Sequence, residues 1–366
     1  MTTDMTTQRV TIGPPPTTQH STGASPPDVE TGPVPARGPL VDKYGRVHRD
    51  LRLSVTDRCS LRCTYCMPEA GVPWLARDTM MTTPEMLRLA RIAVSLGIDE
   101  IRLTGGEPLL RRDLVDVVAG LAAIDPAPEI SMTTNGVGLA KVAGALVEAG
   151  LTRVNVSIDT LKRETFIELS KRDRLKDTLA GIEAAAEAGL APIKLNTVLM
   201  RGINDVEATD LLGFALEHDY QLRFIEQMPL DAQHQWDRSQ MITGAEIMAR
   251  LQTVYELTPM PDDTRGSAPA ELFLVDGGPA TVGVIASVTM PFCGTCDRVR
   301  LTADGQVRNC LFATGETNLR DPLRAGASDD ELAALFCASI GAKLPGHGIN
   351  EPGFLQPPRP MSAIGG

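Results

Sequence analysis

The chain has 366 residues, of which 43% are hydrophobic and 22% are charged, proportions typical of globular proteins. Its 46 acidic and 35 basic residues give a net charge of -11, which argues against general binding to nucleic acids or anionic membranes. No stretch has the pattern of a membrane span or a secretory signal, so we predict a cytoplasmic protein. Six of the seven cysteines fall in two tight groups, a spacing that favours metal binding over disulfides.

The predicted organisation begins with a disordered tail over residues 1–39, which is rich in Thr, Pro and Gly and contains no Leu, Phe, Tyr or Trp. Such a segment cannot bury enough apolar surface to offset the entropy lost on ordering. Residues 40–228 are predicted to form the main α/β domain, and residues 229–366 a smaller C-terminal region.

In the main domain, strand patterns alternate with amphipathic helical patterns. The strands are predicted at 51–56, 100–104, 129–133, 153–157, 192–198 and 221–226. Thr83 is expected to cap the first helix, and Asn204 with Glu207 predicts a capping box further on. Helix ends are predicted at Gly97, Gly150 and Gly189. Repeated βα units imply parallel strands with right-handed crossovers, and hence a partial (β/α)6 barrel similar to a TIM barrel.

Polar and apolar residues alternate along the predicted strands. The polar positions are Arg52, Ser54, Thr56, Arg102, Thr104, Ser131, Thr133, Asn155, Ser157, Asp159, Lys194 and Asn196. With a period of two they share one face of the sheet, while the apolar neighbours meet the helices. A polar inner face predicts a lumen that holds polar ligands, whereas the alternative is a sheet face in contact with solvent.

The C-terminal region has a different rhythm. Residues 229–240 are predicted to be a loop and 243–254 a short helix, followed by hairpins over 271–312 with a turn at Asp304-Gly305. An apolar helix is predicted from Leu332 to Ile340. It contains the seventh cysteine, Cys337, which we interpret as a buried apolar residue.

The strongest chemical signal is Cys59-x3-Cys63-x2-Cys66, directly after the first predicted strand. A short loop with three thiolates can bind three irons of a 4Fe-4S cluster and leave the fourth iron open. Structural zinc is the alternative, but zinc takes four ligands and no histidine stands nearby in the sequence.

This spacing, with Tyr65 before the last cysteine, resembles the radical SAM (S-adenosylmethionine) superfamily, as does Gly105-Gly106-Glu107-Pro108 after the second strand. The resemblance implies a 4Fe-4S cluster whose open iron chelates the amino and carboxylate groups of SAM. One electron then cleaves SAM to methionine and a 5'-deoxyadenosyl radical. The SAM contacts that it implies are Tyr65, Gly106, Ser157 and Met228.

A second group, Cys293-x2-Cys296-x13-Cys310, surrounds a predicted hairpin whose turn brings the last thiol back toward the first two. A zinc ribbon, with His347 as a fourth ligand, is the alternative. The spacing, the Asp297-Arg298-Val-Arg300 run and the Gly365-Gly366 end resemble the GTP 3',8-cyclase family, from about residue 40 to the C-terminus. The resemblance implies a second 4Fe-4S cluster that contacts GTP.

An acidic chain must hold the roughly four negative charges of GTP with local cations. By family position the GTP contacts are Arg52, Arg102, Thr133, Lys194, Arg298, Val299 and Arg300, and Arg223 is an addition that we make from its place on a predicted strand. Glu100 departs from the family, in which a lysine often stands at this position. No phosphate-binding G-x-x-x-x-G-K-[ST] loop occurs, so a P-loop GTPase is not supported.

The resemblance therefore implies a lyase of molybdenum-cofactor synthesis that removes the C3' hydrogen of GTP and joins C3' to C8. Gly365 and Gly366 would enter the site as catalytic residues. The implied partners are GTP, an electron donor such as flavodoxin or ferredoxin, the downstream cyclic pyranopterin monophosphate synthase, and a second copy of the chain in a homodimer. The alternatives are a peptide-modifying radical SAM enzyme and a metal-binding redox sensor without turnover.

Overall fold

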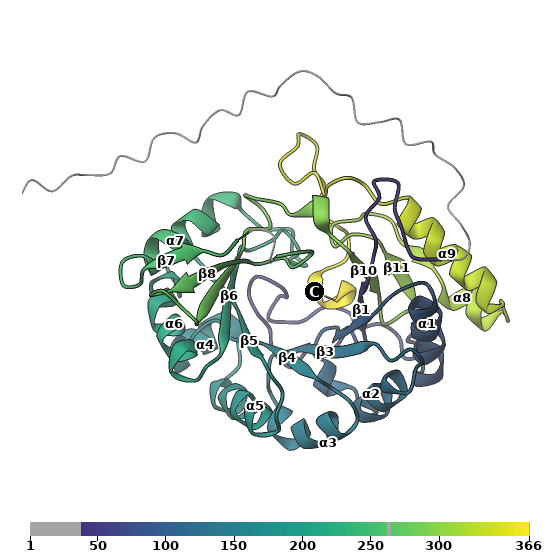
Figure 1. Cartoon of the computed structure of the whole chain (residues 1–366), viewed down its shortest axis with the longest axis horizontal. Helices are drawn as coiled ribbons and strands as arrows, with labels where there is room; N and C mark the ends of the chain where they lie inside the picture. Colours follow the sequence, from purple (N-terminus) through teal and green to yellow (C-terminus); the bar gives the residue numbers. More distant parts are fainter. Residues whose placement is uncertain (1–37, 262–264, 366) are drawn as a thin grey trace, which may run out of the picture. The chain divides into compact units, whose positions relative to one another are not determined.

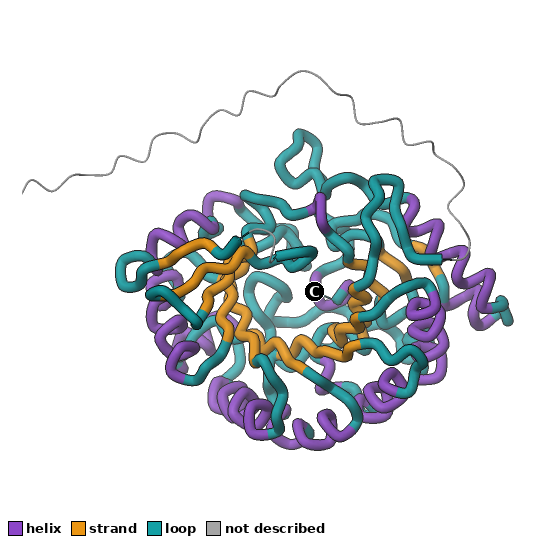
Figure 2. The backbone as a smooth tube through the Cα atoms, viewed as in Figure 1, coloured by secondary structure: helices purple, strands orange, loops and turns teal. Residues whose placement is uncertain are grey.

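The computed structural model describes residues 38–261 and 265–365, and in this part of the chain one sheet of twelve strands curves with helices on its outer side (Figures 1 and 2). The strand order is β12-β11-β10-β1-β2-β3-β4-β5-β6-β9-β8-β7. The predicted tail over 1–39 lies outside the described residues, apart from Gly38 and Pro39. No helix within the described ranges is long and apolar enough to cross a membrane.

The centre of the sheet consists of six parallel strands in chain order, as predicted. They are β1 (Asp50–Ser54), β2 (Glu100–Thr104), β3 (Glu129–Thr134), β4 (Arg153–Ser157), β5 (Ile193–Val198) and β6 (Gln221–Ile225). The predicted bounds differ from these by at most two residues at either end. The alternation of apolar and polar residues was sufficient to locate these strands because each has one face against helices.

Both edges of this central sheet are extended by strands from the C-terminal region. β9 (Thr281–Ile285) lies parallel to β6, and β10 (Arg298–Leu301) lies parallel to β1. The predicted hairpins are present, since β8 (Glu271–Val275) pairs with β9 and β11 (Gln306–Arg308) pairs with β10. The outermost strands are β7 (Leu257–Pro259) and β12 (Thr317–Asn318). The predicted regions 40–228 and 229–366 therefore share one sheet.

The helices lie along the convex side of the sheet (Figure 1). They are α1 (Thr83–Ser95), α2 (Leu114–Ala122), α3 (Ala143–Glu148), α4 (Arg163–Ser170), α5 (Leu175–Glu187), α6 (Ala208–Glu217), α7 (Gly244–Leu251), α8 (Arg320–Arg324) and α9 (Asp329–Gly341). The short α10 (Met361–Ile364) lies instead inside the barrel, where Met361 lines the cavities described below. The core between sheet and helices contains the apolar strand residues, for example Leu51, Leu53 and Val154, which are fully buried. Cys337 on α9 belongs to this core, as predicted.

Two of the predicted helix caps are wrong. The side chain of Thr82, not Thr83, accepts the cap hydrogen bond of α1 and forms a capping box with Glu85. Asn204 makes no cap bond, because its amide accepts from the backbone N–H of Met200 (2.6 Å) and donates to two backbone carbonyls, one just after strand β4 and one at the last residue of β5. The side chain of Asn204 therefore bonds to the ends of two strands instead of capping its helix.

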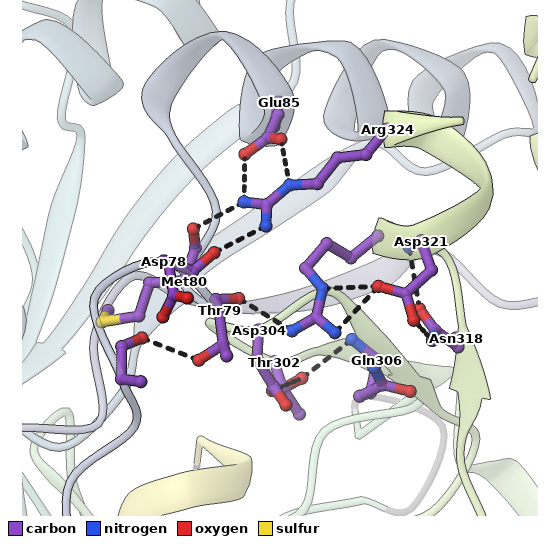
Figure 3. A network of polar contacts seen from close by, with 12 residues as sticks. Asp78, Thr79, Met80, Glu85, Thr302, Asp304, Gln306, Asn318, Asp321 and Arg324 are labelled. Atoms are coloured by element: carbon purple, nitrogen blue, oxygen red, sulfur yellow. Dashed lines mark hydrogen bonds and ion pairs between the residues drawn. The ribbon is translucent and has the colours of Figure 1, made fainter. Parts of the chain in front are cut away.

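Arginines on α8 tie the C-terminal layer to the segment that precedes α1 (Figure 3). Arg324 pairs with Glu85 at 2.7 Å and donates to the backbone carbonyls of Asp78 (2.6 Å) and Met80 (3.0 Å). The exposed ion pair alone contributes little, but the carbonyl bonds fix its geometry. The contact holds the hairpin of β10 and β11 against the first βα unit.

Candidate active site

The first cysteine group, Cys59, Cys63 and Cys66, follows β1 on a loop that the glycine motif clamps in place. The backbone N–H of Gly106 donates to the carbonyl of Thr56 at 2.9 Å. A Cβ atom on Gly106 would lie 2.3 Å from the carbonyl oxygen of Arg58, and one on Gly105 would lie 2.2 Å from that of Thr56. Both positions therefore require glycine, because any side chain would push the two loops apart.

Glu107 of the same motif acts within the protein. Its buried carboxylate accepts from the hydroxyl of Thr134 (2.7 Å) and from the backbone N–H groups of Asn135 (2.7 Å) and Leu109 (3.0 Å). Burial raises the pKa of this carboxyl to about 7, against the lowering effect of these hydrogen bonds. Glu107 thus fixes the end of β3 beside the cysteine loop.

The first cysteine group lines an inner cavity of about 240 Å³, which we call the first cavity. The residues predicted to contact SAM, namely Tyr65, Gly106, Ser157 and Met228, all line it as well. The hydroxyl of Tyr65 donates to Asp159 at 2.6 Å, and burial beside that carboxylate raises the pKa of Tyr65 well above its usual value. The four residues that the family resemblance implies as SAM contacts therefore line one cavity, although they are far apart in the sequence.

The second cysteine group, Cys293, Cys296 and Cys310, lines a neighbouring cavity of about 170 Å³, the second cavity. The two cavities share the lining residues Thr133, Asn196, Ile225, Met228 and Met361. Because a single set of side chains borders both, the two cysteine groups open on adjoining parts of one interior. All six of these cysteines are free thiols.

Two buried cations hold the second cysteine group from outside the cavity, and neither was predicted, because no local motif marks them. The guanidinium of Arg46 donates to the carbonyl of Cys293 at 2.7 Å. The ammonium of Lys343 lies 3.6 Å from the sulfur of Cys296 and donates to the carbonyl of Arg298 at 2.9 Å. Burial alone would raise the pKa of Cys296, but Arg298 and Lys343 lower it to about 7.

Arginines from four strands form a row on the inner face of the sheet. Strand register aligns Arg300 with Arg52, Arg52 with Arg102, and Arg102 with Arg153 through Ser131. We call Arg300, Arg52, Arg102 and Arg153 the arginine row. These side chains are buried or largely buried, so the alternative of a sheet face in contact with solvent is wrong.

Acidic residues at the start of β1, β2 and β3 form ion pairs with the arginine row. Asp50 pairs with Arg52 at 2.9 Å. Glu100 pairs with Arg102 and with Arg153, the latter at 3.0 Å, and Glu129 also pairs with Arg153. Glu100, which stands where the family often has a lysine, is therefore not an isolated anion, because it forms ion pairs with both Arg102 and Arg153. Arg153 was not predicted, although extending the period-two pattern of β4 by one step from Asn155 would have included it.

Cation crowding is strongest at the second cavity. Burial, followed by repulsion from Arg52, lowers the pKa of Arg300 to about 10, and burial with repulsion from Arg102 does the same for Arg223. Burial and Arg223 lower the pKa of Lys194 to about 7. Within the described chain, Arg223 Nε, Arg298 Nε and Asn196 Oδ1 are buried without a hydrogen-bond partner. Unpaired buried groups of this kind suit a polar, anionic ligand.

The remaining predicted GTP contacts divide into two kinds. Arg298, beside the ring of Phe292 at 4.9 Å, and Thr133 both line the second cavity. Lys194 does not line it directly but pairs in register with Asn155, which does. The side chain of Val299 is fully buried in the hydrophobic core and does not line the second cavity.

The described end of the chain lies inside the barrel, where the label for the C-terminus stands in Figure 1. The carbonyl of Gly365 accepts from Arg300 Nε at 3.2 Å. A Cβ atom on Gly365 would lie 2.0 Å from Ser54 Oγ and 2.5 Å from Thr104 Oγ1, and its φ of 75° also favours glycine. Gly366, the other predicted tail residue, lies outside the described residues.

The donor sets suit clusters better than single ions. In the described ranges, no three Cys, His, Asp or Glu side chains are arranged to hold one metal ion. A cubane cluster separates its thiolate ligands because each binds a different iron, so three free thiols along one cavity wall fit it. His347 lines the second cavity, where its ring packs at a tilt against that of Phe312, with 4.8 Å between ring centroids.

The fold and the first cysteine group define a radical SAM enzyme, and the family model described as the Radical SAM superfamily matches residues 53–215. The model described as Molybdenum Cofactor Synthesis C matches residues 220–349. The chain is 61% identical to "GTP 3',8-cyclase" of Streptomyces coelicolor over 89% of this chain and 96% of the relative. It is 56% identical to "GTP 3',8-cyclase 2" of Mycobacterium tuberculosis over 91% and 94%. The chain belongs to the GTP 3',8-cyclase family.

Two solved structures have a similar fold. Streptococcus suis SuiB bound to its precursor peptide SuiA has a TM-score of 0.57 at 13% identity, covering 82% of this chain and 69% of that one. The enzyme anSMEcpe with bound AdoMet has a TM-score of 0.54 at 14% identity, covering 82% and 79%. At these identities the likeness concerns the fold alone, and it agrees with the predicted barrel.

Proposed function

We infer that this chain is a radical SAM enzyme that acts as a GTP 3',8-cyclase in molybdenum cofactor biosynthesis. The observation that carries this function is the convergence of two three-cysteine groups and an arginine row on adjoining cavities. Family membership argues against the alternatives of a peptide-modifying enzyme and a sensor without turnover.

For the first cavity, we propose that Cys59, Cys63 and Cys66 hold a 4Fe-4S cluster with an open iron. Tyr65, Gly106, Ser157 and Met228 would surround SAM there, which is supported by their common cavity. When bound, the cluster and SAM supply a 5'-deoxyadenosyl radical by one-electron cleavage of SAM. The apolar and buried walls exclude water from this radical.

For the second cavity, we propose that Cys293, Cys296 and Cys310 hold a second 4Fe-4S cluster beside the guanine of GTP. The arginine row, Arg298, Lys194 and Arg223 would neutralise the triphosphate, with Thr133 and the backbone of Val299 as further contacts. The crowded cations favour this assignment, because an anionic ligand relieves their mutual repulsion. Arg153 enters the set on the basis of its register with Arg102.

We propose that the 5'-deoxyadenosyl radical takes the C3' hydrogen of GTP, giving 5'-deoxyadenosine, and that C3' then bonds to C8 as the double bond between C8 and N7 opens. One further electron from the electron donor and one proton at N7 complete (8S)-3',8-cyclo-7,8-dihydroguanosine 5'-triphosphate. The protein contributes orientation, because substrate and SAM would be held on either side of the shared lining residues. Gly365 and Gly366 would assist close to the reacting atoms, which is supported by the contact between Gly365 and Arg300.

Partners beyond GTP are further proposals of the same kind. The first cluster needs a one-electron donor such as flavodoxin or ferredoxin, and the cyclic product would pass to the downstream cyclic pyranopterin monophosphate synthase. A homodimer and a cytoplasmic location stay predictions from the sequence.

Anaerobic reconstitution with iron and sulfide, followed by incubation with SAM, GTP and dithionite, tests the function. We expect about eight iron atoms per chain and a cyclised guanosine triphosphate as product. About four irons would reject the second cluster. SAM cleavage without any cyclised nucleotide would reject the cyclase assignment.

A further inference from the structure

A surface depression lies beside the first cysteine group and is separate from both inner cavities. Four segments build it: the cysteine loop, the turn after the glycine motif, the connection from β3 to α3, and the residues between α4 and α5. The lining residues are Ser60, Leu109, Leu110, Val137, Gly138, Lys141, Val142, Arg172 and Arg174. None of them lines the first or the second cavity.

The charge of this lining is opposite to that of the chain. It carries three cations and no carboxylate, whereas the whole chain has a net charge of -11. One of the cations, Arg174, pairs with Asp177 at 2.7 Å outside the lining. Leu110 adds an exposed apolar group, at 45% of its full accessible surface. An apolar centre with cations around it is typical of a surface that binds an acidic partner transiently.

One side chain connects the depression to the first cysteine group. The amide nitrogen of Asn135 lies 3.9 Å from the sulfur of Cys59 and donates to the hydroxyl of Ser60 at 3.0 Å. The carbonyl oxygen of the same amide accepts from the backbone N–H of Val137 at 3.0 Å. Ser60 and Val137 both line the depression, so a partner seated there is one residue away from a cluster ligand.

The cysteine loop lies between the first cavity and the outer depression. Cys59 lines the first cavity with its thiol, while Ser60, the next residue, lines the outer depression. An electron could therefore reach the cluster site from the outer side of the loop without opening the cavity in which a radical would form. The end of α4 supports the loop at this place, because the N–H of Arg62 donates to the carbonyl of Ser170 at 2.9 Å.

We propose that this depression, the carrier surface, docks a small acidic protein that carries one electron to the first cysteine group. The proposal rests on the proposed function, which requires one electron for each SAM cleavage. The carrier is oxidised by one electron and the cluster is reduced by one electron, with no atom transferred. The net charges of the two proteins repel, so the local cations must orient the encounter.

The test uses the reconstituted holoenzyme and flavodoxin photoreduced under anaerobic conditions. The variant Lys141→Glu/Arg174→Glu reverses two charges of the carrier surface. The control Lys43→Glu/Arg91→Glu makes the same change of net charge at two exposed residues away from it. Stopped-flow absorbance gives the rate of cluster reduction by flavodoxin, and surface plasmon resonance gives the affinity for it. Dithionite, a small reductant that needs no docking, is used in parallel.

We expect the carrier-surface variant to lose more than tenfold in both affinity and reduction rate at low salt, and the control variant to lose less than threefold, since electrostatic steering changes association rates by ten-fold or more. Dithionite-driven SAM cleavage should be equal in all three proteins. Equal flavodoxin rates in parent and carrier-surface variant would overturn the proposal. A parallel fall with dithionite would also overturn it, because the substitutions would then act on the cluster. Cyclisation by the parent protein with dithionite tests the proposed function separately.

Discussion

The two cysteine groups each offer three thiols to one interior, but cations act on them differently. At the second group they lower the pKa of Cys296, although burial still raises that of Cys293. Burial, with nearby Asp159 and Asp231, raises the thiol pKa values of the first group, that of Cys66 to about 12. At the second group, Arg298 and Lys343 overcome burial and lower the pKa of Cys296 to about 7. Both groups therefore offer thiol ligands, but the charges around them suit different bound molecules.

This difference separates the proposed roles of the two groups. Near the first group, the described residues that line the cavity include no arginine or lysine, which suits SAM, a ligand with a positive sulfonium. Near the second group the walls carry Arg52, Arg102, Arg223, Arg298 and Arg300, which suits a triphosphate. Variants that abolish one role and preserve the other therefore test whether the two groups differ in function.

The largest effect is expected from Cys59→Ser, Cys63→Ser or Cys66→Ser. Each removes a proposed ligand of the first cluster, so SAM cleavage should fall below detection. Formation of 5'-deoxyadenosine, measured by chromatography with dithionite as reductant, checks this. Cleavage at the parent rate in any of the three variants would show that the first cysteine group does not hold the SAM cluster.

Cys293→Ser, Cys296→Ser and Cys310→Ser should behave differently. They should remove the proposed second cluster and leave the first, so cyclised nucleotide should disappear while uncoupled SAM cleavage continues. The ratio of 5'-deoxyadenosine to cyclised product is the measurement, with iron content as the control. A ratio equal to that of the parent would remove the distinction between the two groups.

The chain end should have an intermediate effect. Deletion of Gly365-Gly366 removes the carbonyl that accepts from Arg300 and is expected to lower cyclisation by more than tenfold, a barrier increase above about 1.4 kcal/mol. Iron content and thermal stability should stay at parent values because the deleted residues contribute no side chain to the core. Activity within twofold of the parent would take the tail out of the mechanism.

Within the arginine row, Arg300→Ala should weaken GTP binding by about 1.5–3 kcal/mol, the range for a hydrogen bond to a charged group. Arg153→Ala should cost less, because Glu100 and Glu129 already share its charge. Calorimetry with GTP, GDP and SAM distinguishes the sites. Weaker SAM binding with unchanged GTP binding would assign these arginines to the wrong cavity.

The smallest effect concerns Lys194, whose pKa of about 7 in the free site leaves part of the population neutral near pH 7. A bound triphosphate favours the ammonium form, so GTP binding should take up protons, and affinity should fall as pH rises above about 7. Calorimetry in buffers of different ionisation enthalpy measures the uptake. Lys194→Met should abolish it, and equal uptake in that variant would assign the proton to another group.

From the sequence alone we could predict the six parallel strands, both cysteine groups and most of the residues that line the two cavities. Period-two alternation decides which side of a strand meets helices, and metal ligands are recognised by spacing within one loop. The GTP 3',8-cyclase family was also identifiable, because its motifs extend over most of the chain.

Only the folded structure shows that β9 and β10 join opposite edges of the six-stranded sheet. Their pairing sets the position of the second cysteine group. It also decided that Glu100 holds Arg102 and Arg153, that Lys343 reaches the sulfur of Cys296, and that Gly365 lies against Ser54. These contacts join residues that are far apart in the chain or lie on neighbouring strands. Local pattern carries no information on such pairs, because their energy arises only when packing and register bring the groups together.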